Sequence, residues 1–459
     1  MPFIAAFLRH WPKAAYLMFS VLLAGSLFAV QGTAAARSGA GDNPLSLFAG
    51  ATLTRDSSGR IIASFDRDHS GYQIDRLPSG AVTINDIQTR KFSDVRVRDV
   101  ALLLFSDGWS YDVVTGRWTD LGVTSVLTSK GSSLRICPGV GAGCDASSLA
   151  EGLRRATAGS IVTLAPGVYR EAGALTAHGV TIRADPGAHI TGVATEGKAA
   201  LVIRGNNVVV EGVHCSNIAV PDHNGACIRF EGRNLTILGA YFHDAEEGVL
   251  VGDQGGVVII EDSRFERLGA IGRAHGVYVN HIKELVIRRS CFLSSRDEGH
   301  EVKSRAARTV IENSLIASFD GHDSRLVDAP NGGELIITNS VFEKGERSSN
   351  YDVIGFGLEG VAYQANSVQI ENTIVVMDHP FSRLLNGSIV PVIKGVHLIG
   401  GRRWEAPPLA NWTSDRKAAG LPPYSASPDS LANAQERLFG VAPAAMAECL
   451  RKSPTAQGR

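Results

Sequence analysis

An eight-residue pattern of apolar and polar positions recurs seven times between residues 208 and 375. Its first, third and eighth positions are mostly apolar, and its fifth is polar or glycine. A strand-like run precedes each of the later copies, and glycine, asparagine and aspartate separate the run from the copy that follows. The seven copies are VVVEGVHC (208–215), LTILGAYF (235–242), VIIEDSRF (258–265), LVIRRSCF (285–292), TVIENSLI (309–316), LIITNSVF (335–342) and VQIENTIV (368–375).

Successive copies begin 23 to 33 residues apart. One coil of this length, with two or three short strands, cannot bury its own apolar face, but stacked coils can. Each strand then pairs in parallel with its counterpart one coil on. The pattern therefore predicts an all-β fold, a parallel β-helix. Asn313, Asn339 and Asn372, at the fifth position, predict an inward-facing asparagine ladder at a bend, with a structural role.

The segment that precedes the repeat begins with an amphipathic pattern from Ser148 to Ala158, which predicts a short helix. Strands and turns with "PGVY" and "DPGA" follow. Such a helix would cover the open end of the stack, whose edge strand would otherwise pair with other chains. This stretch closely resembles the N-terminal cap and first coils of the pectate-lyase-like right-handed β-helix superfamily. The resemblance covers about residues 137–400, implies a right-handed parallel β-helix, and leaves the activity open.

Three flanking segments complete the predicted organisation. Residues 1–36 place basic residues before an uncharged apolar run and the small residues GTAAA, which is typical of a secretory signal peptide, with an uncleaved membrane anchor as the alternative. Residues 41–128 alternate apolar and polar positions between turns and predict a small accessory β module. Residues 401–459 predict a Pro-rich linker and a terminal helix or tail. The expected location is secreted or periplasmic, or anchored to the membrane if the first segment is retained.

Composition narrows the classes of function. The 459-residue chain has a formal net charge of −1, so nucleic acid is not an expected partner. Cys137 and Cys144 in "CPGVGAGC" could pair in an oxidising compartment. Cys215, Cys227 and Cys291 are expected to be buried small apolar residues. No Cys/His spacing suggests a zinc site.

Polar residues gather around the predicted strand at 301–304. If Val302 points into the core, then Glu301, Lys303 and Arg305 point outward. Histidines recur at the turn before each such strand, so stacking should gather side chains from three consecutive coils on one face. The members of this predicted cluster are His275, Tyr278, His300, Lys303, Arg305, His322, Arg325 and Asp328.

Such a face suits β-elimination on a uronic-acid polysaccharide. The reaction needs a cation to neutralise the C5 carboxylate, a base to remove the adjacent proton and an acid to protonate the leaving glycosidic oxygen. Lysine, arginine, histidine and tyrosine can supply all three, so no cofactor is required. The predicted catalytic residues are Lys303, Arg325, His300 and Arg305, and the predicted substrate-binding residues are Tyr278, His275, His322 and Asp328.

A narrower resemblance concerns the motifs VKS (302–304) and SRL (324–326). They are similar to motifs of polysaccharide lyase family 6, which pairs a catalytic lysine with an arginine one coil later. The resemblance implies Lys303 as the base and Arg325 as its acid partner. The family also uses asparagine and glutamate ligands to hold Ca²⁺, although the acidic spacing differs here and the RHG motif after the arginine is absent. The candidate Ca²⁺ ligands are Asn280, Glu298 and Glu301.

Three other functions remain open at this point. A glycoside hydrolase on the same fold needs paired carboxylates, which Asp320, Asp323 and Asp328 could supply. The Asn-Thr-Asp and Asp-Asp motifs of polygalacturonase-like hydrolases are absent. A C5 epimerase would share the proton abstraction, and a non-catalytic polysaccharide-binding or surface scaffold would share the fold. An acidic polysaccharide is the expected partner.

Overall fold

The computed structural model describes most of the chain between Ser132 and Ser425 and parts of its flanks. The predicted signal peptide or anchor lies outside the described residues, as does most of the predicted terminal helix. Within the described part, none of the helices combines the length and the apolar character needed to cross a bilayer. The described residues are 132–139, 143–253, 256–425, 428–431, 434, 438 and, in separate stretches, 52–55, 61–65, 69–76, 82–86, 92–95, 100–105, 109–114 and 116–120.

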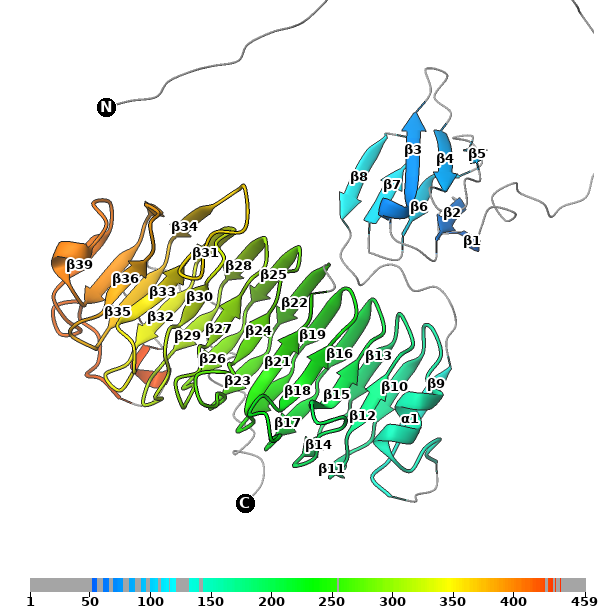
Figure 1. Cartoon of the computed structure of the whole chain (residues 1–459), viewed down its shortest axis with the longest axis horizontal. Coiled ribbons are helices and arrows are strands. Elements are labelled where there is room, and N and C mark those ends of the chain that lie inside the picture. Colours follow the sequence, from blue (N-terminus) through cyan, green and yellow to red (C-terminus); the bar gives the residue numbers. More distant parts are fainter. Residues whose placement is uncertain are drawn as a thin grey trace, which may run out of the picture. The chain divides into compact units, whose positions relative to one another are not determined.

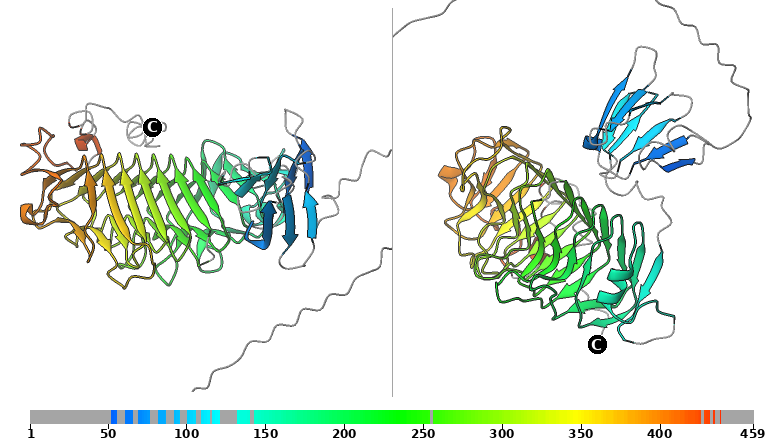
Figure 2. Two further views of the ribbon diagram at one scale, coloured as in Figure 1. Left: turned by 90° about the horizontal axis from the view of Figure 1, so that it is seen from above. Right: turned by 45° about the vertical axis from the view of Figure 1, so that its right-hand side comes forward.

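The central part of the chain is a parallel β-helix, which confirms the predicted fold (Figures 1 and 2). Successive coils contribute strands to three parallel sheets of 11, 11 and 9 strands. Equivalent strands of neighbouring coils pair residue by residue, as Leu285 pairs with Thr309 and Thr309 with Leu335. We call these the β9–β37 sheet, the β11–β39 sheet and the β12–β36 sheet.

The strands of the three sheets have the following bounds. The β9–β37 sheet contains β9 (Ser133–Ile136), β10 (Ile161–Leu164), β13 (Thr181–Ala184), β16 (Val208–Glu211), β19 (Leu235–Leu238), β22 (Val257–Glu261), β25 (Glu284–Arg288), β28 (Arg308–Glu312), β31 (Glu334–Thr338), β34 (Ser367–Glu371) and β37 (Val392–Lys394). The β11–β39 sheet contains β11 (Gly167–Tyr169), β14 (Ala188–Thr191), β17 (His214–Ser216), β20 (Tyr241–His243), β23 (Arg264–Glu266), β26 (Cys291–Leu293), β29 (Leu315–Ala317), β32 (Val341–Lys344), β35 (Ile374–Met377), β38 (His397–Gly400) and β39 (Asn411–Thr413). The β12–β36 sheet contains β12 (Gly173–Leu175), β15 (Ala199–Ile203), β18 (Ala226–Phe230), β21 (Glu247–Val251), β24 (Val277–Val279), β27 (Val302–Ser304), β30 (Val327–Ala329), β33 (Asp352–Phe356) and β36 (Arg383–Asn386).

The eight-residue repeat folds as two short strands joined by a bend. In TVIENSLI, β28 and β29 flank Asn313, whose φ of 50° lies in the left-handed region. Asn339 and Asn372 have φ of 50° and 47° at the equivalent bends. Asparagine tolerates this conformation better than most residues, which explains its recurrence.

The predicted asparagine ladder faces outward and not inward, because Asn339 and Asn372 are exposed. Its predicted hydrogen bonding along the stack is confirmed where the Asn372 side-chain amide donates to Asn339 Oδ1 at 3.3 Å. The residue after each bend turns inward instead, and those of consecutive coils form a buried serine ladder. The Ser290 hydroxyl oxygen accepts the backbone N–H of Ser263 at 3.1 Å, and the Ser314 hydroxyl oxygen accepts that of Ser290 at 3.2 Å. The ladder satisfies backbone groups that the bend removes from the sheets.

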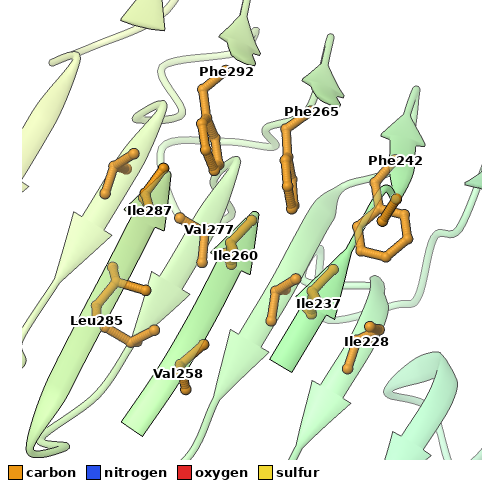
Figure 3. Packing of buried hydrophobic residues seen from close by; sticks show 14 of the residues in the cluster. Ile228, Ile237, Phe242, Val258, Ile260, Phe265, Val277, Leu285, Ile287 and Phe292 are labelled. Atoms are coloured by element: carbon orange, nitrogen blue, oxygen red, sulfur yellow. The ribbon is translucent and has the colours of Figure 1, made fainter. Parts of the chain in front are cut away.

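Phenylalanines at the eighth repeat position pack against one another inside the β-helix, edge to face between Phe242 and Phe265 and in parallel between Phe265 and Phe292. Figure 3 shows Phe242, Phe265 and Phe292 on consecutive coils, beside branched residues such as Ile260 and Ile287. Ring centroids lie 5.3 Å apart between Phe242 and Phe265, and 4.4 Å apart between Phe265 and Phe292. All three are at most 1% exposed. Burying a side chain of this size contributes about 1.5–3 kcal/mol.

The predicted capping helix is present as α1 (Leu149–Arg155) and is shorter than the apolar pattern suggested. The Ser148 hydroxyl caps it by accepting the Glu151 backbone N–H at 3.2 Å. Leu149 and Leu153 are buried. Gly152 allows a close approach to the first coil, since a Cβ there would lie 2.2 Å from Ile136 Cδ1.

The disulfides correct one prediction. Cys137 and Cys144 are bonded, as the sequence allowed. Cys215 and Cys227 are also bonded, with their Cα atoms 5.9 Å apart, so they are not separate buried thiols. Cys291 is disulfide-bonded as well. The sequence could not show the second bond, because β17 and β18 lie in different sheets and the path of the turn between them brings the two cysteines together.

The segment predicted as a linker adds to the β-helix. It supplies β39, which pairs with β38, and a short 3₁₀ helix (Arg403–Glu405). Arg416 binds the carboxylate of Asp378 through two bonds of 2.6 Å. Leu421 is buried against the β11–β39 sheet in a cluster that includes Ile374. A second 3₁₀ helix spans Pro428–Leu431.

The predicted accessory β module is present as two small sheets with their own core. The aromatic rings of Phe65, Tyr72 and Phe105 lie 4.9–5.6 Å apart in that core. The five-stranded sheet contains β1 (Thr52–Arg55), β2 (Ile61–Ser64), β6 (Leu102–Leu104), β7 (Trp109–Asp112) and β8 (Arg117–Asp120), and the three-stranded sheet contains β3 (Tyr72–Arg76), β4 (Val82–Asp86) and β5 (Phe92–Val95). A 3₁₀ turn (His69–Gly71) precedes β3.

Candidate functional site

Strand register gathers most of the predicted cluster on the outer face of the β12–β36 sheet. Tyr278 is opposite Lys303 across β24 and β27, and Lys303 is opposite Asp328 across β27 and β30. Val302 is fully buried, whereas the Lys303 side chain keeps 13% of its surface exposed. Three consecutive coils thus place Tyr278, Lys303 and Asp328 side by side, and we call these three residues the row.

Lys303 and Arg305 share the carboxylate of Glu359. Arg305 Nη2 lies 2.6 Å from Glu359 Oε2, and Lys303 Nζ lies 3.6 Å from Glu359 Oε1. Burial alone would raise the pKa of Glu359, but its hydrogen bond to Arg305 and the charge of Lys303 lower that pKa below the ordinary value. Glu359 comes from the loop after β33, and its side chain is 48% exposed. The two cations therefore hold a carboxylate at the solvent edge of the row.

Tyr278 lies against both of these cations. Its hydroxyl oxygen accepts the Arg305 Nε–H at 2.9 Å. The ring centroid lies 5.5 Å from Lys303 Nζ and 5.8 Å from the Arg305 guanidinium carbon. Since the bond to Arg305 uses a lone pair, the phenolic proton can be donated to another group. Asn331 accepts a further hydrogen bond from Arg305.

Arg325 lies between two buried carboxylates. Its Nη1 is 3.4 Å from Asp328 Oδ1, and its Nε is 3.2 Å from Asp352 Oδ2. The side chain can cross the next coil because Gly355 has no Cβ, which would lie 2.5 Å from Asp328 Oδ1 and 2.6 Å from Arg325 Cδ. With 19% of its side chain exposed, Arg325 is both fixed and accessible.

His275 and His300 stack beneath the row with centroids 4.8 Å apart. His275 Nδ1 accepts the His300 backbone N–H at 3.0 Å, and His300 Nδ1 accepts the Arg325 backbone N–H at 3.0 Å. Each neutral ring therefore carries its proton on Nε2. Burial, with nearby positive charge as a smaller cause, lowers the pKa of both well below the ordinary value. His300 Nε2 faces Asp328 Oδ2 at 3.6 Å, so His300 positions Arg325 and Asp328.

Two buried acids, Asp328 and Glu247, have raised pKa values, whereas that of the exposed Glu359 is lowered. Burial raises the pKa of Asp328, while Arg325 and Lys303 oppose that shift. Burial also raises the pKa of Glu247 well above the ordinary value. Burial is the largest cause of both upward pKa shifts, because it disfavours the charged form of each acid.

Four predicted residues lie apart from this row. His322 is exposed on its turn. Glu298 is exposed and lies beside Gly272. Asn280 donates its side-chain amide to the Val251 carbonyl at 2.9 Å. Glu301 was expected to point outward, but it is 1% exposed.

The Glu301 carboxylate accepts the backbone N–H and the hydroxyl of Ser295 at 2.6 and 2.8 Å. Asn280 and Glu301 thus bond to different partners and Glu298 is exposed, so the three do not form the oxygen cage that Ca²⁺ requires. The candidate hydrolase carboxylates are also dispersed, because Asp323 is fully buried in an ion pair with Lys344 at 3.0 Å while Asp320 is exposed.

Sequence reasoning missed Glu359, Asp352 and Asn331. Asp352 can be identified once the strand register is known, because it occupies the position one coil after that of Arg325 in the same sheet. Glu359 is 54 residues from Arg305 in the chain and lies in a loop, where the repeat sets no register. Neither of two described cavities, of about 750 and 320 Å³, includes Lys303 or Arg325 among its lining residues.

No protein-family model and no curated protein matches the chain. Among solved structures, it is similar to an alginate lyase from Paenibacillus sp. str. FPU-7, with a TM-score of 0.43 and 18% identity over 58% of this chain and 94% of that one. Pectate lyase Pel9A gives 0.36 and 14% over 57% and 79%. The pectin methylesterase from Aspergillus niger gives 0.36 and 14% over 58% and 92%. The parallel β-helix fold of this chain rests on its own strand pairing.

Proposed function

We propose that this protein is exported and acts on an acidic, uronic-acid polysaccharide as a lyase, by β-elimination at Tyr278 and Lys303 of the row and the neighbouring Arg305 and Arg325. The observation that carries the proposal is the Glu359 carboxylate, held by Lys303 and Arg305 at the accessible edge of the row. A uronate residue presents the same chemical group and can replace Glu359 there.

The elimination assigns a role to each side chain. Arg305 and Arg325 would neutralise the C5 carboxylate, and Lys303 would act as the base that takes the C5 proton. The electron pair of that C–H bond forms the C4–C5 double bond while the C4–O bond breaks. The leaving oxygen then needs a proton, which the Tyr278 hydroxyl can donate. We give Arg325 no acid role, because a guanidinium does not release its proton in proteins.

Two rivals share part of this chemistry. A C5 epimerase would use the same proton abstraction and return the proton to the other face. A hydrolase would need two accessible carboxylates at a defined separation. Asp328 and Asp352 flank Arg325, but they are only 3% and 6% exposed and both contact that arginine. The row therefore favours elimination or epimerisation over hydrolysis.

The test is an ultraviolet assay for unsaturated product on a panel of alginate, pectin and glycosaminoglycan polymers. The wild-type protein should generate absorbance on at least one polymer, and Lys303→Ala should abolish it. Lys394→Ala is a matched control, because that lysine also lies near a carboxylate but is 74% exposed in the β9–β37 sheet. Full activity in Lys303→Ala would exclude the assignment, and inactivity of the wild type on every polymer would favour a scaffold.

A further inference from the structure

A second cluster of titratable side chains lies in the β11–β39 sheet and has no part in the proposed lyase site. His189 of β14 is opposite His214 of β17, and Ser216 of β17 is opposite His243 of β20. All three histidines are half-buried and reachable from solvent. Local spacing could not reveal them, because each comes from a different coil.

The ring nitrogens converge. His214 Nε2 lies 2.8 Å from His243 Nε2. The His189 ring stacks on His214 with centroids 3.7 Å apart and an interplanar angle of 4°. One ring nitrogen from each histidine lies within 4.8 Å of the others. Among the described residues, this is the one group of three or more histidine, cysteine, aspartate or glutamate side chains that comes this close.

These separations lie near the dimensions of a metal site. A tetrahedral ion with metal–nitrogen bonds of about 2.0–2.1 Å places its ligand nitrogens about 3.3 Å apart. The His214–His243 nitrogens would separate by about half an ångström, and nitrogens up to 4.8 Å apart would approach by at most about 1.5 Å. The His189 ring would have to rotate out of its parallel stack on His214 to face the same ion. The backbone of three paired strands would stay fixed.

A carboxylate orients one of the rings. Asp244 Oδ2 lies 2.6 Å from His243 Nδ1, so the Nδ1 proton is held there and Nε2 faces the cluster. Arg267 fixes Asp244 through bonds of 2.9 and 2.7 Å. A carboxylate behind a histidine is the usual outer-shell support of a metal ligand, because it sets the tautomer and raises the basicity of the ligating nitrogen.

A serine–histidine dyad does not explain the cluster. The Ser216 hydroxyl lies 2.8 Å from His189 Nε2, but Ser216 is fully buried and also bonded to Thr191 and Asn217. A purely structural ladder of stacked rings is the remaining alternative.

We propose that His189, His214 and His243 bind a first-row transition-metal ion, with Zn²⁺ as the simplest occupant. Imidazole nitrogen suits Zn²⁺, Cu²⁺ and Ni²⁺, whereas Ca²⁺ and Mg²⁺ prefer oxygen. Three protein ligands leave one coordination position for water or another small ligand. The site is independent of the lyase proposal, since it lies in a different sheet.

The experiment uses the full chain, freed of metal by a chelator and titrated with Zn²⁺ in a calorimeter. One Zn²⁺ per chain should bind, and His214→Ala should abolish this binding. Asp244→Asn should weaken it about 10–100-fold. His281→Ala is the matched control, because His281 also faces a carboxylate, Asp253 at 3.2 Å, but is exposed in another part of the β-helix.

Binding of Co²⁺ to the wild type should give the visible absorption of a tetrahedral nitrogen site, which provides a readout even if His214→Ala does not fold. Ca²⁺ in excess should not displace the Zn²⁺. The proposal is overturned if the wild type binds no stoichiometric Zn²⁺, or if folded His214→Ala binds it as tightly as the wild type. Either result would leave the stacked rings a structural ladder.

Discussion

At the scale of single residues, Glu359 occupies the position that the proposed substrate carboxylate would take. Glu359→Gln keeps an oxygen that can accept from Arg305 but removes the competing charge. We expect the KM for an acidic oligosaccharide to fall by up to tenfold, equivalent to about 1.4 kcal/mol, with little change in kcat. Steady-state kinetics would measure this.

Glu371→Gln is the control for that variant, since Glu371 lies 3.8 Å from Lys394 in another sheet. It should leave the KM unchanged. If Glu359→Gln instead raises the KM, then Glu359 assists binding and does not stand in for the substrate.

Glu301 makes a prediction about stability and pH. Burial, with Asp323 as the next cause, raises the pKa of Glu301 to about 8 from an ordinary 4.5. A raised carboxyl pKa contributes stability that is complete below pH 4.5 and is lost as the pH rises toward 8. The wild type should therefore lose about 1.4 kcal/mol per pH unit relative to Glu301→Gln in this window. Urea unfolding at several pH values measures the difference, and a constant difference would contradict the shift.

Strand alternation predicts the direction of a side chain within a strand but not at the turns. Val302 and Lys303 lie within β27, so their inward and outward directions follow from period two. Glu301 precedes the strand and turns back to Ser295, which the alternation could not show.

At the scale of the element, the bend inside each repeat decides which side chains are inward. Asn313 has a left-handed backbone conformation, which reverses the inward–outward alternation of side chains along the chain. The side chain of the next residue, Ser314, therefore points into the core. The sequence contained this ladder at the sixth repeat position. Serine or threonine occupies that position in the last five copies of the repeat.

The phenylalanine stack predicts a large cost for a cavity. Phe265→Ala should lower the free energy of unfolding by about 3–5 kcal/mol, because the ring is buried between Phe242 and Phe292 and stacked strands cannot collapse to fill the space. Denaturant unfolding followed by circular dichroism would measure it. Val168→Ala, at a position 51% exposed, should change it by less than about 0.5 kcal/mol. Equal effects of the two substitutions would contradict the packing account.

At the scale of the whole molecule, the β-helix could be predicted because its signal repeats many times. The chemistry could be predicted only in part. The spacing of the repeat was enough to align Tyr278, Lys303 and Asp328. Glu359 could not be placed in this way because it lies in a loop, and the histidine cluster depends on the pairing of strands in three coils.

The most direct test of the central claim is the mass of the products formed from the preferred uronic-acid polymer in heavy-oxygen water. Elimination at the Lys303 row predicts unsaturated ends with no incorporated solvent oxygen, and no product with Lys303→Ala. Incorporation of heavy oxygen at the cleaved bond, or undiminished product from Lys303→Ala, would contradict the account.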